Sequence, residues 1–179
     1  MLTPQEYRRI YYLLDLAAPL AGNCGRLCND ACCKAHSAFE ELGIYLLPGE
    51  EAMFSRQEDW LQWTTHPVAG YDFPPSWEGP VNFVLCQGTC NRTKRPIQCR
   101  TFPLAPHISD GQLVLIKETV DLPYRCPIIF QDLNLQQDFI NYTYQAWLML
   151  VKDPLIKDLV TYDSRQRLAD RQTIFQVFP

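Results

Sequence analysis

The chain lacks any apolar run long enough to cross a bilayer as a helix. Such a helix needs about 20 consecutive apolar residues, and the richest stretch here, Ala146–Val151, is far shorter. The N-terminal residues also lack the basic start and the apolar segment of a secretory signal peptide. We therefore expect no membrane span and a cytoplasmic location.

Common catalytic signatures are absent as well. The sequence contains no glycine-rich phosphate loop, no HExxH string and no GxSxG elbow. Of the three histidines, His36 follows Cys33 closely and is an alternative ligand, whereas His66 and His107 show no partner pattern. A cysteine nucleophile needs an activating histidine. The sequence therefore predicts no catalytic residue and leaves enzymatic activity open.

Positive charge is scarce. The chain has 16 Lys and Arg against 20 Asp and Glu, a formal net charge of −4, and this disfavours nucleic-acid binding because that function needs a basic face. The local exception is a group of four cations between and beside cysteines: Arg92, Lys94, Arg95 and Arg100. These cations lie in a solvated loop, offset the negative charge that four thiolates leave around a metal ion, or form a small nucleic-acid patch, the least favoured of the three.

Cysteine is too sparse for a disulfide scaffold. Such scaffolds usually exceed roughly 8–10% cysteine in a short chain, whereas this chain has eight cysteines in 179 residues. Its hydrophobic content of 47% supports a core without cross-links, and cytoplasmic reductants oppose structural disulfides. We therefore favour metal ligation over disulfides.

The cysteines that are present are closely spaced. They read Cys24-x3-Cys28-x3-Cys32-Cys33, then Cys86-x3-Cys90-x8-Cys99, then Cys126. Two sulfurs on one zinc lie no more than about 4.6 Å apart, but a straight helix would separate Cys24 from Cys32 by roughly 12 Å. Either the backbone turns at Gly25 and Asn29-Asp30, or the cysteines serve more than one centre.

The adjacent pair Cys32-Cys33 favours two centres. Successive side chains point about 100° apart on a helix and to opposite faces on a strand, so the two sulfurs face different places. Eight thiolates divide evenly into two four-coordinate sites. Zinc and an iron–sulfur cluster both accept four thiolates, and the spacing does not separate the two cofactors.

Regular structure is predicted on both sides of the cysteines. A helix begins at Thr3, Pro4 and Glu6, which form a capping box with proline at the first helical position. The expected later segments are strands over Val81–Leu85 and Gln112–Val120, the second after an Asp110-Gly111 turn, and helices within Glu50–Trp63, over Leu133–Lys152 and over about Leu155–Tyr162, with a helix or arm over Arg165–Pro179.

The predicted fold class is α+β, because strands and helices do not alternate regularly. We expect a small irregular metal-thiolate core with short strands, flanked by an N-terminal helix and C-terminal helices. The length fits a single domain over 1–179. Within it, a metal-binding region covers about 24–128 and a helical region covers about 133–179.

The cysteine motif resembles the YkgJ-type cysteine-cluster family. The resemblance rests on Cys24, Cys28 and Cys32-Cys33, on the string C86QGTC90, on C126P127 and above all on RPIQCRTFPL, which runs from Arg95 to Leu104. It spans roughly Cys24 to Cys126. It implies a cytoplasmic protein that chelates zinc or iron through eight cysteines, which here are Cys24, Cys28, Cys32, Cys33, Cys86, Cys90, Cys99 and Cys126.

Three functions are compatible with this motif. The first is an iron–sulfur (4Fe–4S, for example) or iron centre for electron transfer, redox sensing or metal handling, with Arg95 and Arg100 beside the cofactor. The second is a structural zinc module that binds a protein partner through the apolar C-terminal tail. The third is a protein-modifying enzyme that uses the metal centre, because the family includes a module of flagellin lysine-methylating enzymes.

Overall fold

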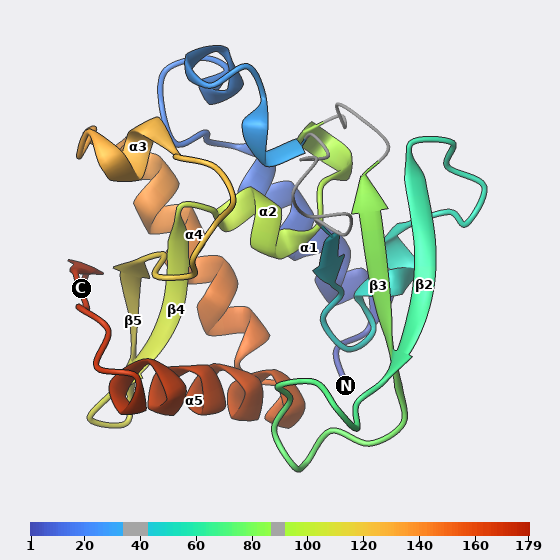
Figure 1. The fold of residues 1–179 in the computed structure, drawn as a ribbon. Helices are drawn as coiled ribbons and strands as arrows, with labels where there is room; N and C mark the ends of the chain where they lie inside the picture. Colours follow the sequence, from blue (N-terminus) through green and yellow to red (C-terminus); the bar gives the residue numbers. More distant parts are fainter. Residues whose placement is uncertain (34–42, 87–91) are drawn as a thin grey trace.

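The fold is α+β, as predicted: two small antiparallel sheets combine with an N-terminal helix and C-terminal helices (Figure 1). The computed structural model describes residues 1–33, 43–86 and 92–179. One sheet has the strand order β1-β3-β2 and the other the order β4-β5-β6. These strands are β1 (Gly43–Tyr45), β2 (Leu61–Pro67), β3 (Pro80–Cys86), β4 (Leu104–Ser109), β5 (Gln112–Lys117) and β6 (Gln176–Phe178).

The long helices are α1 (Pro4–Asp15), α4 (Gln137–Leu150) and α5 (Pro154–Ala169). Helices α4 and α5 pack on the second sheet, α1 packs on α4, and short helical turns connect the rest. The short segments are η1 (Cys24–Leu27), η2 (Ala31–Cys33), η3 (Glu50–Met53), η4 (Arg92–Lys94), α2 (Ile97–Thr101) and α3 (Pro127–Phe130). Most cysteines therefore lie on short or irregular elements.

Helix α1 begins as the sequence predicts. The Thr3 hydroxyl accepts from the Glu6 backbone N–H at 3.3 Å, and the Glu6 carboxylate accepts from the Thr3 N–H at 2.8 Å. This capping box satisfies two backbone donors that a helix start leaves without partners. The helix buries one apolar stripe, which includes Tyr7, Ile10 and Leu14.

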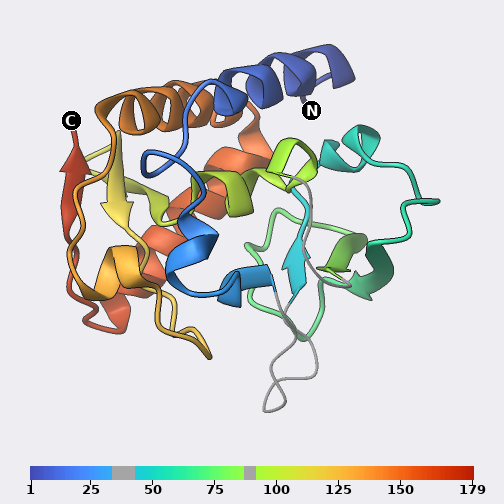
Figure 2. The ribbon, with the colours of Figure 1, turned by 90° about the horizontal axis from the view of Figure 1, so that it is seen from above.

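The main core lies between α1, α4, α5 and the β4-β5 hairpin. Helices α1 and α4 run side by side in Figure 2 and pack against one another. Three fully buried members show how the elements meet: Ile10 comes from α1, Leu115 from β5 and Leu150 from α4. A smaller cluster of Leu46, Leu61 and Val84 underlies the β1-β3-β2 sheet.

The β4-β5 hairpin turns at Asp110-Gly111, as predicted. Both residues have positive φ, 50° and 79°, which is the requirement of a tight type I′ hairpin turn. Helix α5 lies along β4, which is an edge strand of its sheet. The Ser164 hydroxyl accepts from the Ile108 N–H at 2.9 Å, and Arg167 donates to the Pro106 carbonyl at 3.1 Å.

The prediction of a helix within Glu50–Trp63 is wrong for most of its length. Only the turn η3 forms there, and the chain then enters β2, which pairs with β3 over seven residue pairs. Leu61 and Trp63 pack in the cluster under this sheet. That burial outweighs the weak helical pattern, since tertiary packing commonly overrides propensity.

The C-terminal tail divides between two elements. Helix α5 is longer than predicted and ends at Ala169, and the last residues form β6 against β5. Val177 and Phe178 pack on the main core, and the Phe178 ring meets Tyr144 edge-on at 5.0 Å. This tail therefore packs within the chain, and a partner that docks on it stays a prediction. Among the described residues, none of the helices is long and apolar enough to span a bilayer.

Candidate metal centre

The first cysteine segment turns at Gly25 and at Asn29-Asp30, which is one of the two alternatives that the cysteine spacing left open. The Asn23 side chain accepts from the Gly25 N–H at 3.0 Å and so caps η1. Asn29 and Asp30 both adopt left-handed φ of 54°, and these two residues turn the chain into η2. A Cβ on Gly25 would lie 1.8 Å from a carboxylate oxygen of Asp30. Glycine is therefore needed at position 25 for the turn to close.

Cys126 lies beside this folded segment although it is far away in sequence. Cys126 immediately precedes α3, and α3 neighbours the Cys24–Cys33 segment in Figures 1 and 2. Burial raises the pKa of the Cys24 thiol, and the charges of Cys32 and Cys126 raise it further. Cys32 and Cys126 therefore lie close enough to Cys24 for their charges to affect its ionisation.

The surroundings of Cys126 show the same coupling. Burial raises the pKa of this thiol, the backbone N–H groups of Ile129 and Ile128 lower it, and the charges of Cys28 and Cys32 raise it. We call these four residues the Cys126 group: Cys24, Cys28, Cys32 and Cys126. The pKa shifts of Cys24 and Cys126 thus link these four predicted ligands electrostatically.

Two more predicted ligands lie on the other side of Cys32. Cys86 ends β3 and Cys99 lies in α2, and both line a cavity together with Cys32. Cys32 is therefore a member of the Cys126 group and also lines the cavity with Cys86 and Cys99. The prediction for Cys90 and the alternative ligand His36 lie outside the described residues, and of Cys33 only the backbone is described.

The described thiols are reduced and not arranged around a common point. The cysteines at 24, 28, 32, 86, 99 and 126 form no disulfide. Within residues 1–33, 43–86 and 92–179, no group of three or more His, Cys, Asp or Glu side chains stands at metal-binding geometry. The donor set fits a thiophilic metal by its chemistry, since clustered cysteines suit zinc or iron–sulfur clusters.

Arg100 is a buried clamp on the loop before α2. Its side chain is 1% exposed and lies over the Tyr11 ring at 4.3 Å. Its guanidinium donates to Asp15 at 2.6 Å, to the Arg95 carbonyl at 2.8 Å and to the Thr93 carbonyl. These bonds tie residues 93–95 to α1. A contact of Arg100 with a cofactor stays a prediction.

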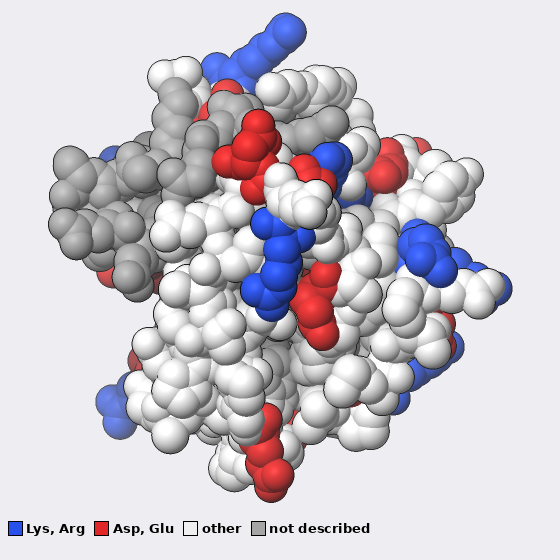
Figure 3. Space-filling model, turned by 90° about the vertical axis from the view of Figure 1, so that its right-hand side faces the viewer, with Lys and Arg blue, Asp and Glu red and all other residues white. Residues whose placement is uncertain are grey.

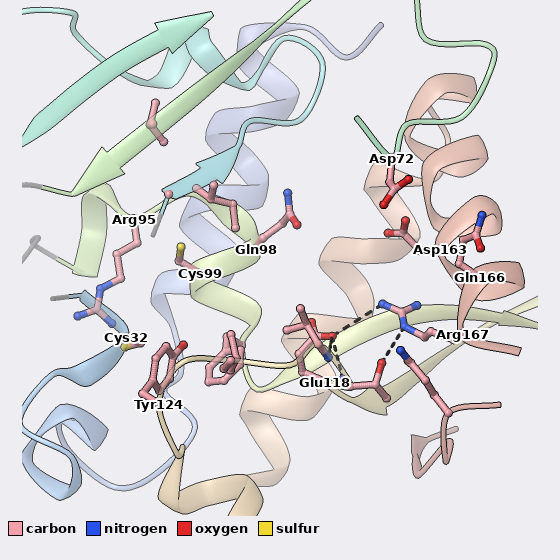
Figure 4. Close-up of a pocket in the computed structure, with 18 of the residues that line it drawn as sticks. Cys32, Asp72, Arg95, Gln98, Cys99, Glu118, Tyr124, Asp163, Gln166 and Arg167 are labelled. Carbon is pink, nitrogen blue, oxygen red and sulfur yellow. Dashed lines mark hydrogen bonds and ion pairs between the residues drawn. The ribbon is translucent and has the colours of Figure 1, made fainter. Parts of the chain in front are cut away.

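Two other arginines of this loop lie near Cys24. The charges of Arg92 and Arg95 favour the thiolate of Cys24 and lower its pKa against the effect of burial. Arg92 also donates to the Ala17 carbonyl at 2.9 Å, and burial lowers its own pKa. Arg95 lines the cavity beside Cys32 (Figure 4). Arg92 and Arg95 therefore offset negative charge on the Cys24 thiolate.

Glu50 is a buried carboxylate that the sequence did not single out. It accepts from the Ile97 N–H at 2.7 Å, the Tyr11 hydroxyl at 2.7 Å and the Leu47 N–H at 3.0 Å. Burial raises its pKa, and these hydrogen bonds act in the opposite direction. Since Ile97 begins α2, Glu50 fixes the helix that carries Cys99. No local motif marks such a residue, because its partners are distant in sequence.

The two described histidines are engaged in packing. His66 lies within 2.9 Å of the Tyr45 hydroxyl and stacks on Tyr71 and Phe83. His107 is 4% exposed on β4, and burial lowers its pKa. Neither histidine adds a donor to the Cys126 group.

The face at the right of Figure 1 shows no continuous field of one charge. In Figure 3, Lys and Arg side chains are interspersed with Asp and Glu among uncharged residues. A phosphate backbone needs a basic stripe or patch. This face therefore offers no such surface among the described residues.

The cavity beside the cysteines has a volume of about 520 Å³. Cys32, Cys99 and Arg95 lie at one side of it, and Asp72, Asp163 and Arg167 lie at the other (Figure 4). Its apolar lining includes Ile44, Val84, Phe102, Val120 and Leu122. Its volume lies within the range of roughly 300–1,000 Å³ that is typical of small-molecule sites.

Comparison with family models, curated proteins and solved structures finds no match to this chain.

Proposed function

We propose that this protein binds a metal centre through cysteine thiolates and belongs to the YkgJ-type cysteine-cluster family. The cofactor proposed first is an iron–sulfur cluster or iron, for electron transfer, redox sensing or metal handling. The observation that carries the proposal is that neighbouring cysteines raise the pKa values of Cys24 and Cys126: Cys32 and Cys126 act on Cys24, and Cys28 and Cys32 act on Cys126. Cys126 is distant in sequence from the other three, so the fold is what crowds its thiol with theirs.

A metal ion would relieve the cost of this crowding. Burial and neighbouring thiolates raise the pKa values of Cys24 and Cys126, so a cation that binds thiolates replaces protons and removes their repulsion. The backbone N–H groups of Ile129 and Ile128 favour the Cys126 thiolate and lower its pKa. Backbone groups beside a ligand commonly tune a metal site in this way.

Ligation would draw these side chains closer than they stand now. The turns at Gly25 and at Asn29-Asp30 leave η1 and η2 as short, separate pieces. Short pieces need only small backbone shifts to bring sulfurs within coordination distance. Metal binding and local folding are commonly coupled in such sites.

A second centre is proposed for the remaining thiols. Cys86 and Cys99 line the cavity, and the predicted ligands Cys33 and Cys90 complete a set of four by count. Cys32 lines the same cavity as Cys86 and Cys99, which supports a second centre close to the first.

Metal analysis of protein purified without air tests the proposal. An iron–sulfur protein is brown and absorbs visible light, and dithionite bleaches it reversibly, whereas the zinc alternative is colourless. Cys126→Ser and Cys99→Ser should each lower the metal bound per chain by about half, because each removes a ligand from one set. Glu78→Gln, an exposed change, is the control and should keep full metal content.

The proposal fails if protein with reduced thiols takes up neither iron and sulfide nor zinc during anaerobic reconstitution. Full metal content in both cysteine variants would also contradict it. The cavity beside Cys32, Cys86 and Cys99 is the one observation that favours the enzyme alternative, since catalysis needs a pocket with convergent polar groups beside the centre.

A further inference from the structure

We propose that the cavity is a binding site for a small organic cation with an apolar body. The ammonium group would sit between Asp72 and Asp163, and the apolar body would extend toward Cys32 and Cys99 (Figure 4). The site needs no metal for binding.

The cavity has two chemically different ends. Asp72 comes from the loop between β2 and β3, and Asp163 comes from α5, so the two carboxylates converge from different parts of the fold. They lie next to each other in Figure 4, and the charge of Asp72 disfavours ionisation of Asp163. Carboxylates that face the same space without a cation between them repel one another.

Arg167, the cation at this end of the cavity, is held by other groups of the protein. Arg167 donates to Thr119 at 3.2 Å and to the Pro106 carbonyl at 3.1 Å, and it lies 3.9 Å from Glu118. Among the described residues, no hydrogen bond or ion pair joins the side chains of Asp72, Asp163 or Asp170 to the protein. Arg167 opposes the rise in the pKa of Asp163. The cavity nevertheless keeps net negative charge, because its two arginines, Arg95 and Arg167, stand against four carboxylates: Asp72, Glu118, Asp163 and Asp170.

The cavity lining also contains apolar side chains, which favour a ligand with an apolar body. Val84 is almost fully buried in the first sheet, and Val120 and Leu122 approach from the segment after β5. A neutral apolar ligand would leave the carboxylates without a partner, and an anion would be repelled by them. Only a cationic amphiphile satisfies both parts.

Hexylammonium is a suitable probe, with 1-hexanol and hexanoate as the neutral and anionic matches of the same length. Methyl NMR spectra at pH 7.5 should show hexylammonium shifting signals of Val84, Val120 and Leu122. Hexanol should bind at least about tenfold more weakly, because it lacks the charge-assisted hydrogen bond. Hexanoate should not bind.

Asp163→Asn and Asp72→Asn should each weaken hexylammonium at least about tenfold. Glu78→Gln removes an exposed carboxylate from the same loop as Asp72 and lies outside the cavity, so it should bind as the wild type does. Asp72 is itself exposed, so its variant tests the site with little effect on folding.

The proposal is overturned if hexanol or hexanoate binds as tightly as hexylammonium. It is also overturned if the aspartate variants bind like Glu78→Gln, or if no probe shifts the cavity methyl signals. Because the titration uses metal-free protein, its failure leaves the metal proposal standing, and failed metal uptake leaves this site standing.

Discussion

The main core and the cysteine-bearing region are held together by different means. In the core, Ile10, Leu115 and Leu150 are fully buried among apolar neighbours, so burial of apolar surface stabilises it. Around the cysteines, the fully buried side chains include the charged residues Arg100 and Glu50, and the described thiols are only partly covered. A region built on a few polar contacts depends on each contact far more than an apolar core does.

The largest effect should come from the polar clamp. Arg100→Met would leave Asp15 and the carbonyls of Thr93 and Arg95 without their donor. Breaking a buried charged pair costs about 3–5 kcal/mol. Urea unfolding should show this loss, and thiol labelling should show Cys99 reacting at urea concentrations that leave α1 and α4 folded.

Lys94→Met is the control for Arg100→Met. Lys94 makes an exposed ion pair with Glu58 at 2.8 Å, and such pairs contribute roughly 0–1 kcal/mol. Equal losses of unfolding free energy in the two variants would contradict the stabilising role of Arg100.

A core substitution should also destabilise the protein, but without exposing the thiols before the rest of the chain unfolds. Leu150→Ala leaves a cavity in the main core and should lower the free energy of unfolding by about 2–5 kcal/mol. The transition should stay cooperative, with helix content and thiol exposure changing together. Early exposure of thiols in this variant would mean that the two regions do not differ as described.

A smaller and local effect is expected from a substitution at the Gly25 turn. Gly25→Ala puts a methyl group against Asp30 and should cost about 1–3 kcal/mol, as overpacking does. Cys24 and Cys28 should then react faster with a thiol reagent. Adding Asp30→Gly removes the obstructing carboxylate and suits the left-handed φ at that position, so the double variant should recover the slow reaction. No recovery would contradict the steric explanation.

The smallest effect concerns Asp163 at the acidic end of the cavity. Burial raises the pKa of Asp163 to about 6 from its usual 3.8, with Glu118 and Asp72 adding to the shift and Arg167 opposing it. Because the folded state holds this proton more tightly than the unfolded state, stability is highest below about pH 4 and is lost as the pH rises through 6.

Asp163→Asn should therefore stabilise the protein at pH 7.5. A shift of this size corresponds to about 3 kcal/mol at most, and partial exposure reduces the expected gain to about 1–2 kcal/mol. Urea unfolding at pH 7.5 and at pH 4 measures the difference, which should vanish at the lower pH. A gain that persists at pH 4 would show that the charge is not its cause.

Local signals were enough to predict part of this fold. The capping box of α1, the strand ending in Cys86 and the Asp110-Gly111 hairpin turn each depend on neighbouring residues, and each forms as predicted. The turns at Gly25 and Asn29-Asp30 were one of two alternatives that the ligand spacing allowed. Strand β2 was missed because its register against β3 decides it, and register is a long-range property.

The candidate site was predictable in residue type and less so in arrangement. The pattern named the cysteines and the arginines, but the nearness of Cys126 to Cys24 depends on how α3 packs. Glu50 and the cavity were missed for the same reason. Glu50 meets Tyr11 and Ile97 from distant segments, and Asp163 meets Asp72 across two elements.

The contacts of α5 with β4 also bear on how this protein behaves at high concentration. An open strand edge presents backbone donors and acceptors that a strand of another molecule can join. Ser164 and Arg167 occupy the outward backbone groups of Ile108 and Pro106. The helix therefore shields this edge, and intermolecular β-pairing with aggregation is prevented there as long as α5 stays in place.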